Sequence, residues 1–255
     1  MPDGDFAGAD SAGVDIAGAD IAGAEIAGVD IAGADFAGRM VIVIGAAGAL
    51  GAGLVTAFTE AGATVNGVDK AVPAADRRLD GVSYQAVNAA DDAALGALFE
   101  QGAPPWAVVN AVGGFAPYAP LAELDPAVLS GQLELNLISA ALVTKHALRR
   151  MATAGQGRIV HTASRAAVVT KGSNFAYSVS KLGVLHLVSM AADEAKGTGI
   201  TVNCVVPSII DTPANRSAMP NAEHASWPKI PDIARAYVFL ASPAARLVSG
   251  AALPV

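Results

Sequence analysis

Residues 40–51 read MVIVIGAAGALG, and this stretch decides the fold. Its first five residues form a short β-branched apolar run, which is typical of a buried parallel strand. Three glycines follow at intervals of three, and residues 52–58 then have the composition of a helix. Small residues let the chain turn tightly, and the helix N-terminus then faces the diphosphate of a dinucleotide. The candidate cofactor contacts in this turn are Gly45, Gly48, Ala49, Leu50 and Gly51.

An acidic residue follows the next strand. The apolar run at 64–68 ends at Asp69, eighteen residues after the last glycine of the turn. A carboxylate at this distance accepts a hydrogen bond from the ribose 2′-hydroxyl and repels a 2′-phosphate. Asp69 therefore predicts NAD as the cofactor, while the nearby basic residues Lys70, Arg77 and Arg78 leave NADP open. The alternative is a glycine turn that serves only helix–sheet packing.

Tyr177 and Lys181 form the second informative pattern. They are four residues apart, so on a helix they lie on one face, one turn from each other. An ammonium beside a phenol favours the phenolate and is expected to lower the pKa of Tyr177. A hydroxyl in that state can exchange a proton with a substrate oxygen. Ser164 lies thirteen residues upstream at the end of an apolar run.

In combination, these motifs resemble the short-chain dehydrogenase/reductase family, and the likeness covers residues 39–255. The segment Asn110-Ala111-Val112-Gly113-Gly114 is similar to the family's Asn-Ala-Gly segment beside the cofactor. Asn136 matches the helix asparagine that holds a water in the family's proton relay. The sequence departs from the family in the spacing of its glycines and in Ser208, which follows Pro207 where a glycine is usual.

The resemblance implies a role for each matching residue. Ser164 would orient the substrate oxygen, and Tyr177 would act as general acid in reduction and general base in oxidation. Lys181 would bind the nicotinamide ribose and activate Tyr177, and Asn136 would position water. The implied catalytic residues are Asn136, Ser164, Tyr177 and Lys181. The further implied cofactor contacts are Asn88, Asn110, Ala111, Pro207 and Thr212, together with Tyr177 and Lys181.

These roles imply an oxidoreductase that transfers a hydride between NAD(H) and a carbonyl or secondary alcohol, as a homodimer or homotetramer. Segments 112–115, 143–146 and 210–227 are similar to the dihydropteridine reductase branch, which implies NADH-dependent reduction of a quinonoid pterin as an alternative. That branch typically lacks the catalytic serine, whereas Ser164 is present here. A third alternative is a non-catalytic, NAD-sensing interaction protein. Phe115, which follows these motifs, either lines the substrate pocket with Tyr118 or belongs to a structural loop.

Composition bounds the class of protein. The chain has 255 residues, of which 53% are hydrophobic and 15% charged, as suits a sheet covered on both faces. No apolar run approaches the roughly eighteen residues needed to span a bilayer. The first basic residue is Arg39, so a secretory signal is not expected. A single cysteine, Cys204, excludes an intrachain disulfide, and the sequence predicts a cytoplasmic location.

The charge is unevenly distributed. Of the net charge of −7, residues 1–38 contribute eight acidic side chains and no Lys or Arg. The rest of the chain holds 15 acidic and 16 basic residues, so no basic surface predicts nucleic-acid binding. The four histidines lack metal-ligand spacing, and no metal site is expected.

Residues 4–38 are seven tandem pentads, whose centres are Phe6, Ser11, Ile16, Ile21, Ile26, Ile31 and Phe36. A period of five fits neither an amphipathic helix nor a strand. The stretch resembles pentapeptide-repeat proteins, which wind into a four-sided β-helix. Seven pentads make less than two turns of such a coil, so two interpretations stay open: a short coil docked on a domain or subunit, and a mobile acidic leader.

Beyond residue 38, strands and helices alternate. The expected strands are 40–44, 64–68, 82–87, 106–110, 157–163, 200–206 and 251–255. The expected helices are 49–61, 91–101, 126–152, 175–196 and 231–241. The fold class is therefore α/β, a Rossmann-type doubly wound parallel sheet of about seven strands, with 1–38 as a preceding segment and 39–255 as the cofactor-binding domain.

Overall fold

The protein is described by a computed structural model, which covers residues 36–116, 118–169 and 174–255. Seven parallel strands form one sheet in the order β3-β2-β1-β4-β5-β6-β7. The strands are β1 (Met40–Ile44), β2 (Thr64–Asp69), β3 (Ser83–Ala86), β4 (Ala107–Asn110), β5 (Gly157–Thr162), β6 (Ile200–Val206) and β7 (Ala252–Pro254). The predicted fold class is confirmed.

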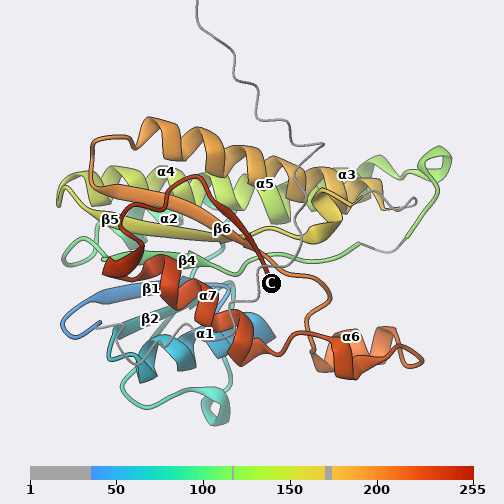
Figure 1. Cartoon of the computed structure of the whole chain (residues 1–255), viewed down its shortest axis with the longest axis horizontal. Coiled ribbons are helices and arrows are strands. Elements are labelled where there is room, and N and C mark those ends of the chain that lie inside the picture. The colour runs from blue at the N-terminus through green and yellow to red at the C-terminus, as the bar shows by residue number, and fades with distance from the viewer. Residues whose placement is uncertain (1–35, 117, 170–173) are drawn as a thin grey trace, which may run out of the picture.

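Helices cover both faces of this sheet (Figure 1). One face carries α1 and α7, and the other carries α2, α4 and α5. The helices are α1 (Ala49–Glu60), α2 (Asp92–Phe99), α3 (Pro126–Gln132), α4 (Ser139–Ala152), α5 (Phe175–Glu194), α6 (Pro213–Ala218) and α7 (Ile230–Ala241). Single 3-10 turns lie at Ala75–Arg77, Leu121–Glu123, Arg165–Ala167, His224–Ser226 and Pro243–Ala245.

Two helical segments differ from the prediction. The expected continuous helix over 126–152 contains a π-helical turn at Leu133–Ile138, which separates α3 from α4. The wider turn carries Asn136, which is buried and hydrogen-bonded across the protein. The short helix α6 was not predicted; Thr212 caps its N-terminus and Pro213 occupies its first turn.

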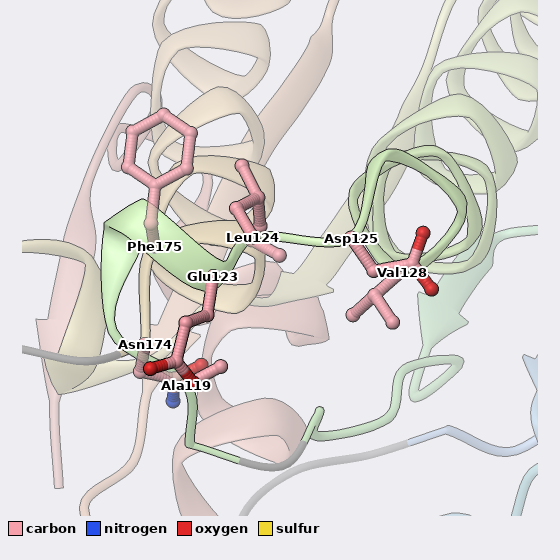
Figure 2. A pocket seen from close by; sticks show the side chains of 8 residues that line it. Ala119, Glu123, Leu124, Asp125, Val128, Asn174 and Phe175 are labelled. Atoms are coloured by element: carbon pink, nitrogen blue, oxygen red, sulfur yellow. The ribbon is translucent and has the colours of Figure 1, made fainter.

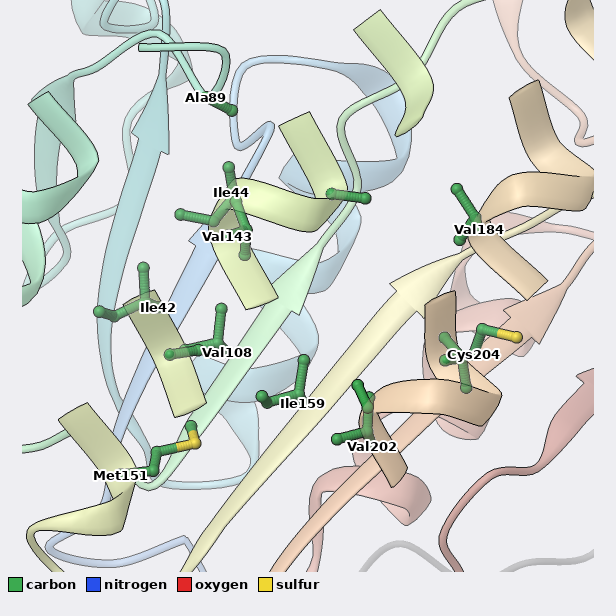
Figure 3. Packing of buried hydrophobic residues seen from close by; sticks show 14 of the residues in the cluster. Ile42, Ile44, Ala89, Val108, Val143, Met151, Ile159, Val184, Val202 and Cys204 are labelled. Carbon is green, nitrogen blue, oxygen red and sulfur yellow. The ribbon is translucent and has the colours of Figure 1, made fainter. Parts of the chain in front are cut away.

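The central strands are buried on both sides, as their apolar runs predict. Ile42, Val108, Ile159 and Val202 lie on successive strands and pack under α4 and α5 (Figure 3). The alternate residues of the same strands face α1 and α7 on the other side. This packing fixes the carboxyl ends of the strands, where the candidate site residues lie.

Phe36 extends the core on the α1 face. Its side chain is fully buried and packs edge to face on Phe58 of α1, with ring centroids 5.3 Å apart. Its backbone N–H also donates to the carbonyl of Ala61. The centre of the last pentad therefore packs on the Rossmann domain, while the other six centres lie outside the described residues.

Two of the described helical segments are long and apolar enough to cross a membrane: 126–152 and Phe175–Glu194, each with a mean hydropathy of 1.3. The sequence analysis expected no segment of this kind, and by length and composition that expectation is wrong. Both segments lie along the sheet and contribute to its core, since Val143, Met151 and Val184 are buried there. Helices that cover a parallel sheet have apolar faces for this reason.

Candidate active site

The order of the strands predicts where a ligand binds. The chain reverses its direction of winding between β1 and β4, and ligands of such sheets bind at the carboxyl ends of the strands beside this switch point. Asp69 ends β2 and Asn110 ends β4, whereas Ser164 follows β5 by two residues. The predicted cofactor and catalytic residues thus gather at one edge of the sheet.

The glycine turn is shaped for close backbone approach. Gly45 has a φ of +89°, and a Cβ on it would lie 2.8 Å from the backbone nitrogen of Val112. A Cβ on Gly51 would lie 1.9 Å from the carbonyl oxygen of Gly45. Gly48 begins α1 without a side-chain cap, so no side chain covers the helix N-terminus there. Ala49 is exposed beside it.

Leu50 has a different role from the other residues of the turn. Its side chain is buried in the core on the α1 face, so only its backbone can face a cofactor. The turn as a whole therefore fits a diphosphate through its main chain.

Asp69 and Arg77 both bond the main chain of one residue of this turn, Ala47. The carboxylate Oδ2 of Asp69 accepts a hydrogen bond from the backbone N–H of Ala47 at 2.9 Å. Arg77 Nη2 donates to the carbonyl oxygen of the same residue, also at 2.9 Å. Arg78 instead donates to the carbonyl of Pro73. The structure thus brings Arg77 to the turn while Arg78 is bonded elsewhere.

Asn88 lies at the same edge of the sheet, one residue after Val87, whose N–H donates to the carbonyl of Asp69. The Asn88 side chain is exposed, and its Oδ1 accepts from the backbone N–H of Ala90 at 3.1 Å. A carbonyl oxygen has two lone pairs, so the predicted contact with an adenine amine is still available.

The side chains of Tyr177 and Ser164 interact at the same edge of the sheet, just after β5. Burial raises the pKa of the Tyr177 phenol, and a side-chain hydrogen bond with Ser164 opposes this shift. The Ser164 side chain is 8% exposed, and its Oγ also accepts from the backbone N–H of Ala166. The two side chains predicted to act on the substrate oxygen therefore lie close to each other.

The predicted effect of Lys181 on Tyr177 is wrong in this structure, because the pKa of Tyr177 is raised and not lowered. Lys181 is 3% exposed, and its Nζ donates to the carbonyl oxygen of Thr162 at 2.8 Å. Burial lowers the pKa of Lys181 itself to about 8. Desolvation thus dominates at both groups, and sequence spacing carries no information on burial.

Asn136 connects Lys181 with the segment after β4. Its Oδ1 accepts from the N–H of Gly114, and its Nδ2 donates to the carbonyl of the same residue and to Ser180 Oγ. A Cβ on Gly113 would lie 2.8 Å from Lys181 Nζ and 2.9 Å from Asn136 Oδ1. The amine and the amide therefore border the same glycine.

A buried histidine supports the neighbouring segment. Thr144 Oγ1 donates to the carbonyl of Ala140 at 2.8 Å, so it accepts from His161 Nε2, which lies at the same distance. His161 Nδ1 is then the acceptor for Asn110 Nδ2, at 3.2 Å. Burial lowers the pKa of His161 to about 4, so the ring stays neutral. Asn110 Oδ1 in turn accepts from Val112 N.

Ala111 and Pro207 contribute through their backbones. The Ala111 carbonyl packs against Gly45, where a Cβ would come within 3.2 Å of its oxygen. The Pro207 carbonyl accepts from the N–H of Arg165, which ties the end of β6 to the loop after Ser164. Thr212 Oγ1 accepts from Asn215 N as the cap of α6, so its hydroxyl hydrogen is free to donate to a ligand.

Comparison with known proteins agrees with this geometry. The family model described as enoyl-(acyl carrier protein) reductase matches residues 45–255. The chain belongs to the short-chain dehydrogenase/reductase family. It is therefore an oxidoreductase of a family that uses a nicotinamide cofactor, NAD or NADP.

Relatives of known activity cover nearly the same length. A cis-4-hydroxycyclohexanecarboxylate dehydrogenase from Sinomonas cyclohexanicum is 37% identical over 235 residues, which are 85% of this chain and 94% of the relative. A D-threitol dehydrogenase from Mycolicibacterium smegmatis is 31% identical over 236 residues, covering 85% and 91%. A short-chain type dehydrogenase/reductase from Mycobacterium ulcerans superposes with a TM-score of 0.79 at 26% identity, over 87% of this chain and 89% of that one.

Four further residues hold the predicted site residues in place and were not predicted from the sequence. Gln132 and Ser180 share the amide of Asn136, and His161 with Thr144 holds Asn110. Gln132 had a sequence signal, because it lies four residues before Asn136 on a helix. The other contacts join segments far apart in the chain. The likeness to the dihydropteridine reductase branch stays a prediction.

A pocket opens at the start of α5 (Figure 2). Its lining residues are Ala119, Glu123, Leu124, Asp125, Val128, Asn174, Phe175 and Ala176. Ser164, Tyr177 and Lys181 do not line this pocket. Across residues 36–116, 118–169 and 174–255, no group of three His, Cys, Asp or Glu side chains could hold a metal ion.

Proposed function

We propose that this chain interconverts a secondary alcohol and a ketone with NAD(H), and that Tyr177 is the general acid and base. The observation that carries the proposal is the placement of four groups at the carboxyl edge of the sheet: Ser164 and Tyr177, whose side chains interact, and Lys181 and Asn136, which border Gly113. A non-catalytic NAD sensor has no physical need for these four groups together.

The raised pKa of Tyr177 suits the reductive direction. A phenol that is protonated at neutral pH can donate its proton to the substrate oxygen as negative charge develops there. Ser164 donates a second hydrogen bond to that oxygen and so orients the carbonyl. When bound, the nicotinamide supplies the hydride. In the oxidative direction, Tyr177 accepts the proton instead.

We assign two supporting roles to Lys181 and Asn136: Lys181 binds the cofactor ribose, and Asn136 positions a water that exchanges the Tyr177 proton with solvent. The Lys181 ammonium beside Gly113 is a donor for the hydroxyls of a ribose. Asn136 keeps the main chain of Gly114 in place through both its N–H and its carbonyl. In reduction, a water held beside this amide returns a proton to Tyr177, and in oxidation it carries the proton outward.

For the cofactor, we favour NAD over NADP. Asp69 ends β2 with its carboxylate at the glycine turn, which is where a 2′-hydroxyl would be bound and a 2′-phosphate repelled. Arg77, bonded to the same turn, gives NADP a residual affinity. Steady-state kinetics with NADH and NADPH test this preference. A higher kcat/KM for NADPH would contradict the role given to Asp69.

The relatives support a small alcohol as substrate. They are named for a hydroxylated cyclohexanecarboxylate and for threitol, which are a ring alcohol and a linear polyol. Both are secondary alcohols that yield ketones on oxidation. We therefore propose a small secondary alcohol or the corresponding ketone.

The decisive variant is Tyr177→Phe. We expect kcat to fall by about 10²- to 10⁴-fold while the Kd for NADH stays within about twofold, since only the proton donor is removed. Tyr84→Phe is the matched control, because the Tyr84 hydroxyl accepts from Leu79 N on the surface near β3. Near-wild-type turnover in Tyr177→Phe would show that another group transfers the proton.

We further propose a cytoplasmic homodimer or homotetramer that associates through the outer faces of the long helices. Leu135 and Ile138 of the π turn and Leu182 and Met190 of α5 are all exposed. Burying these side chains against a second copy would remove apolar surface from water. Sedimentation equilibrium tests this expectation, and a monomer at micromolar concentration would contradict it.

A further inference from the structure

Three aromatic rings stand in series at the proton-transfer end of the crevice. The ring of Phe115 lies 5.0 Å from that of Tyr177, at an interplanar angle of 60°. The ring of Tyr118 lies 5.3 Å from Phe115 at 66°, in an edge-to-face contact. We call Phe115, Tyr118 and Tyr177 the aromatic wall.

The wall leaves much apolar surface uncovered. Phe115 is 55% and Tyr118 is 68% exposed, whereas Tyr177 is half-buried. Two large rings exposed side by side next to a reactive hydroxyl are unusual, because solvation of contiguous apolar surface is unfavourable. Such a surface is covered when an apolar group of a ligand lies on it.

The base of the wall is held from behind. Gly114 precedes Phe115, and Asn136 binds both the N–H and the carbonyl oxygen of this glycine. Tyr118 also acts on Tyr177 electrostatically and contributes to its raised pKa, which places the two side chains within each other's field. Phe115 and Tyr118 are therefore in direct reach of the proton donor, Tyr177.

We infer that the aromatic wall is a subsite for an apolar ring, and that the substrate carries its reacting carbonyl or alcohol in that ring or directly beside it. The carbonyl oxygen must reach the paired hydroxyls of Ser164 and Tyr177. The adjoining ring carbons then lie against Phe115, because the ring centroids of Phe115 and Tyr177 are 5.0 Å apart. This substrate class rests on the proposed function.

A linear polyol fits this surface less well. Its hydroxyls would face the Phe115 ring, which offers no hydrogen-bond partner, and the Tyr118 hydroxyl is the only polar group that the wall adds beside Tyr177. Ring carbons instead make edge and face contacts with aromatic rings. The aromatic wall therefore favours a ring alcohol over a linear polyol as the substrate.

The test compares cyclohexanone with pentan-3-one, which shares the carbonyl and nearly the same carbon count but lacks the ring. In wild-type enzyme with NADH, we expect kcat/KM to be higher for cyclohexanone. Phe115→Ala should lower kcat/KM for cyclohexanone by about tenfold and for pentan-3-one by less than about threefold. Phe115→Leu should restore part of the loss. The inhibition constant of cyclohexanecarboxamide should rise by about tenfold in Phe115→Ala.

Phe175→Ala is the matched control, because Phe175 is 44% exposed and lines the neighbouring pocket shown in Figure 2. It should leave the ratio of the two kcat/KM values unchanged. Equal losses for both ketones in Phe115→Ala, or an equal effect of Phe175→Ala, would overturn the ring subsite while leaving the proposed function intact.

Failure of the proposed function looks different. In that case neither ketone is turned over although NADH binds, or Tyr177→Phe remains active. An unchanged inhibition constant of cyclohexanecarboxamide in Phe115→Ala, with an unchanged circular dichroism spectrum, would overturn the ring subsite by itself.

Discussion

The two ends of the cofactor crevice are built in different ways. At the proton-transfer end, Lys181, Asn136 and Ser164 are 3%, 1% and 8% exposed, and Ser180, one partner of Asn136, is itself buried. At the adenosine end, Arg77 is exposed and holds a main-chain carbonyl at the surface. Buried polar groups are costly to unpair, whereas exposed ones exchange their partners with water. The side chains of the proton-transfer end are therefore held in one arrangement, whereas those of the adenosine end can change partners, so cofactor specificity can change there.

The largest effect that this contrast predicts follows from Lys181→Met. Removing the ammonium takes away the donor beside Gly113, so we expect kcat to fall at least about 100-fold. Steady-state kinetics at saturating NADH measure the effect. Lys145→Met is the control, because Lys145 forms an exposed ion pair with Asp92 and should change kcat by less than about twofold. A normal kcat in Lys181→Met would show that the buried ammonium of the proton-transfer end is not needed for catalysis.

The second prediction concerns stability at acid pH. Burial lowers the pKa of His161 from its ordinary 6.5 to about 4, so between these values the unfolded chain binds a proton that the folded chain does not. The contribution to stability is complete above pH 6.5 and is lost as the pH falls toward 4. The loss is on the order of 3 kcal/mol.

Urea unfolding at pH 7.0, 5.5 and 4.5 measures this loss in wild type and in His161→Gln. The amide of glutamine can still bond Thr144 and Asn110 but does not titrate in this range. We expect the wild type to lose more stability than the variant over this interval. Parallel curves for the two proteins would mean that His161 is protonated in the fold.

Sequence alone established the parts of the molecule that depend on local pattern. The strand, glycine turn and helix of 40–60 follow from periodicity and from residues that allow a tight turn. The position of Ser164 and Tyr177 at one edge followed from the alternation of strands and helices. These features need no knowledge of which distant segments touch.

Properties set by burial and distant contacts were not predictable. The π turn around Asn136 exists together with bonds to Gly114 and Ser180, and the latter is 44 residues away. The sign of the pKa shift at Tyr177 depends on desolvation, which exceeds the effect expected from Lys181. The support of Asn110 by His161 joins β4 to β5, and no local signal marks it.

The third prediction probes the adenosine end through Asp69→Ala. Loss of the carboxylate removes the expected acceptor for a ribose hydroxyl, so KM for NADH should rise by about tenfold while kcat stays within about twofold. KM for NADPH should fall, because the charge that repels a 2′-phosphate is gone. Kinetics with both cofactors measure the two changes. A drop in kcat as large as that in Lys181→Met would mean that the two ends are not separable.

The smallest effect is expected for Arg77→Gln. The guanidinium is exposed and bonded to the carbonyl of Ala47, so it is free to turn toward a 2′-phosphate at little cost. Its loss should lower kcat/KM for NADPH by about threefold and leave kcat/KM for NADH unchanged. Arg78→Gln is the matched control, since Arg78 is bonded to Pro73 and should affect neither cofactor. Because exposed charges are screened, the Arg77→Gln effect should shrink as salt is raised from 50 to 500 mM, a range over which the Debye length falls roughly threefold. Salt-independent losses, or equal losses with both cofactors, would instead show that Arg77 shapes the glycine turn and that this end is as rigid as the other.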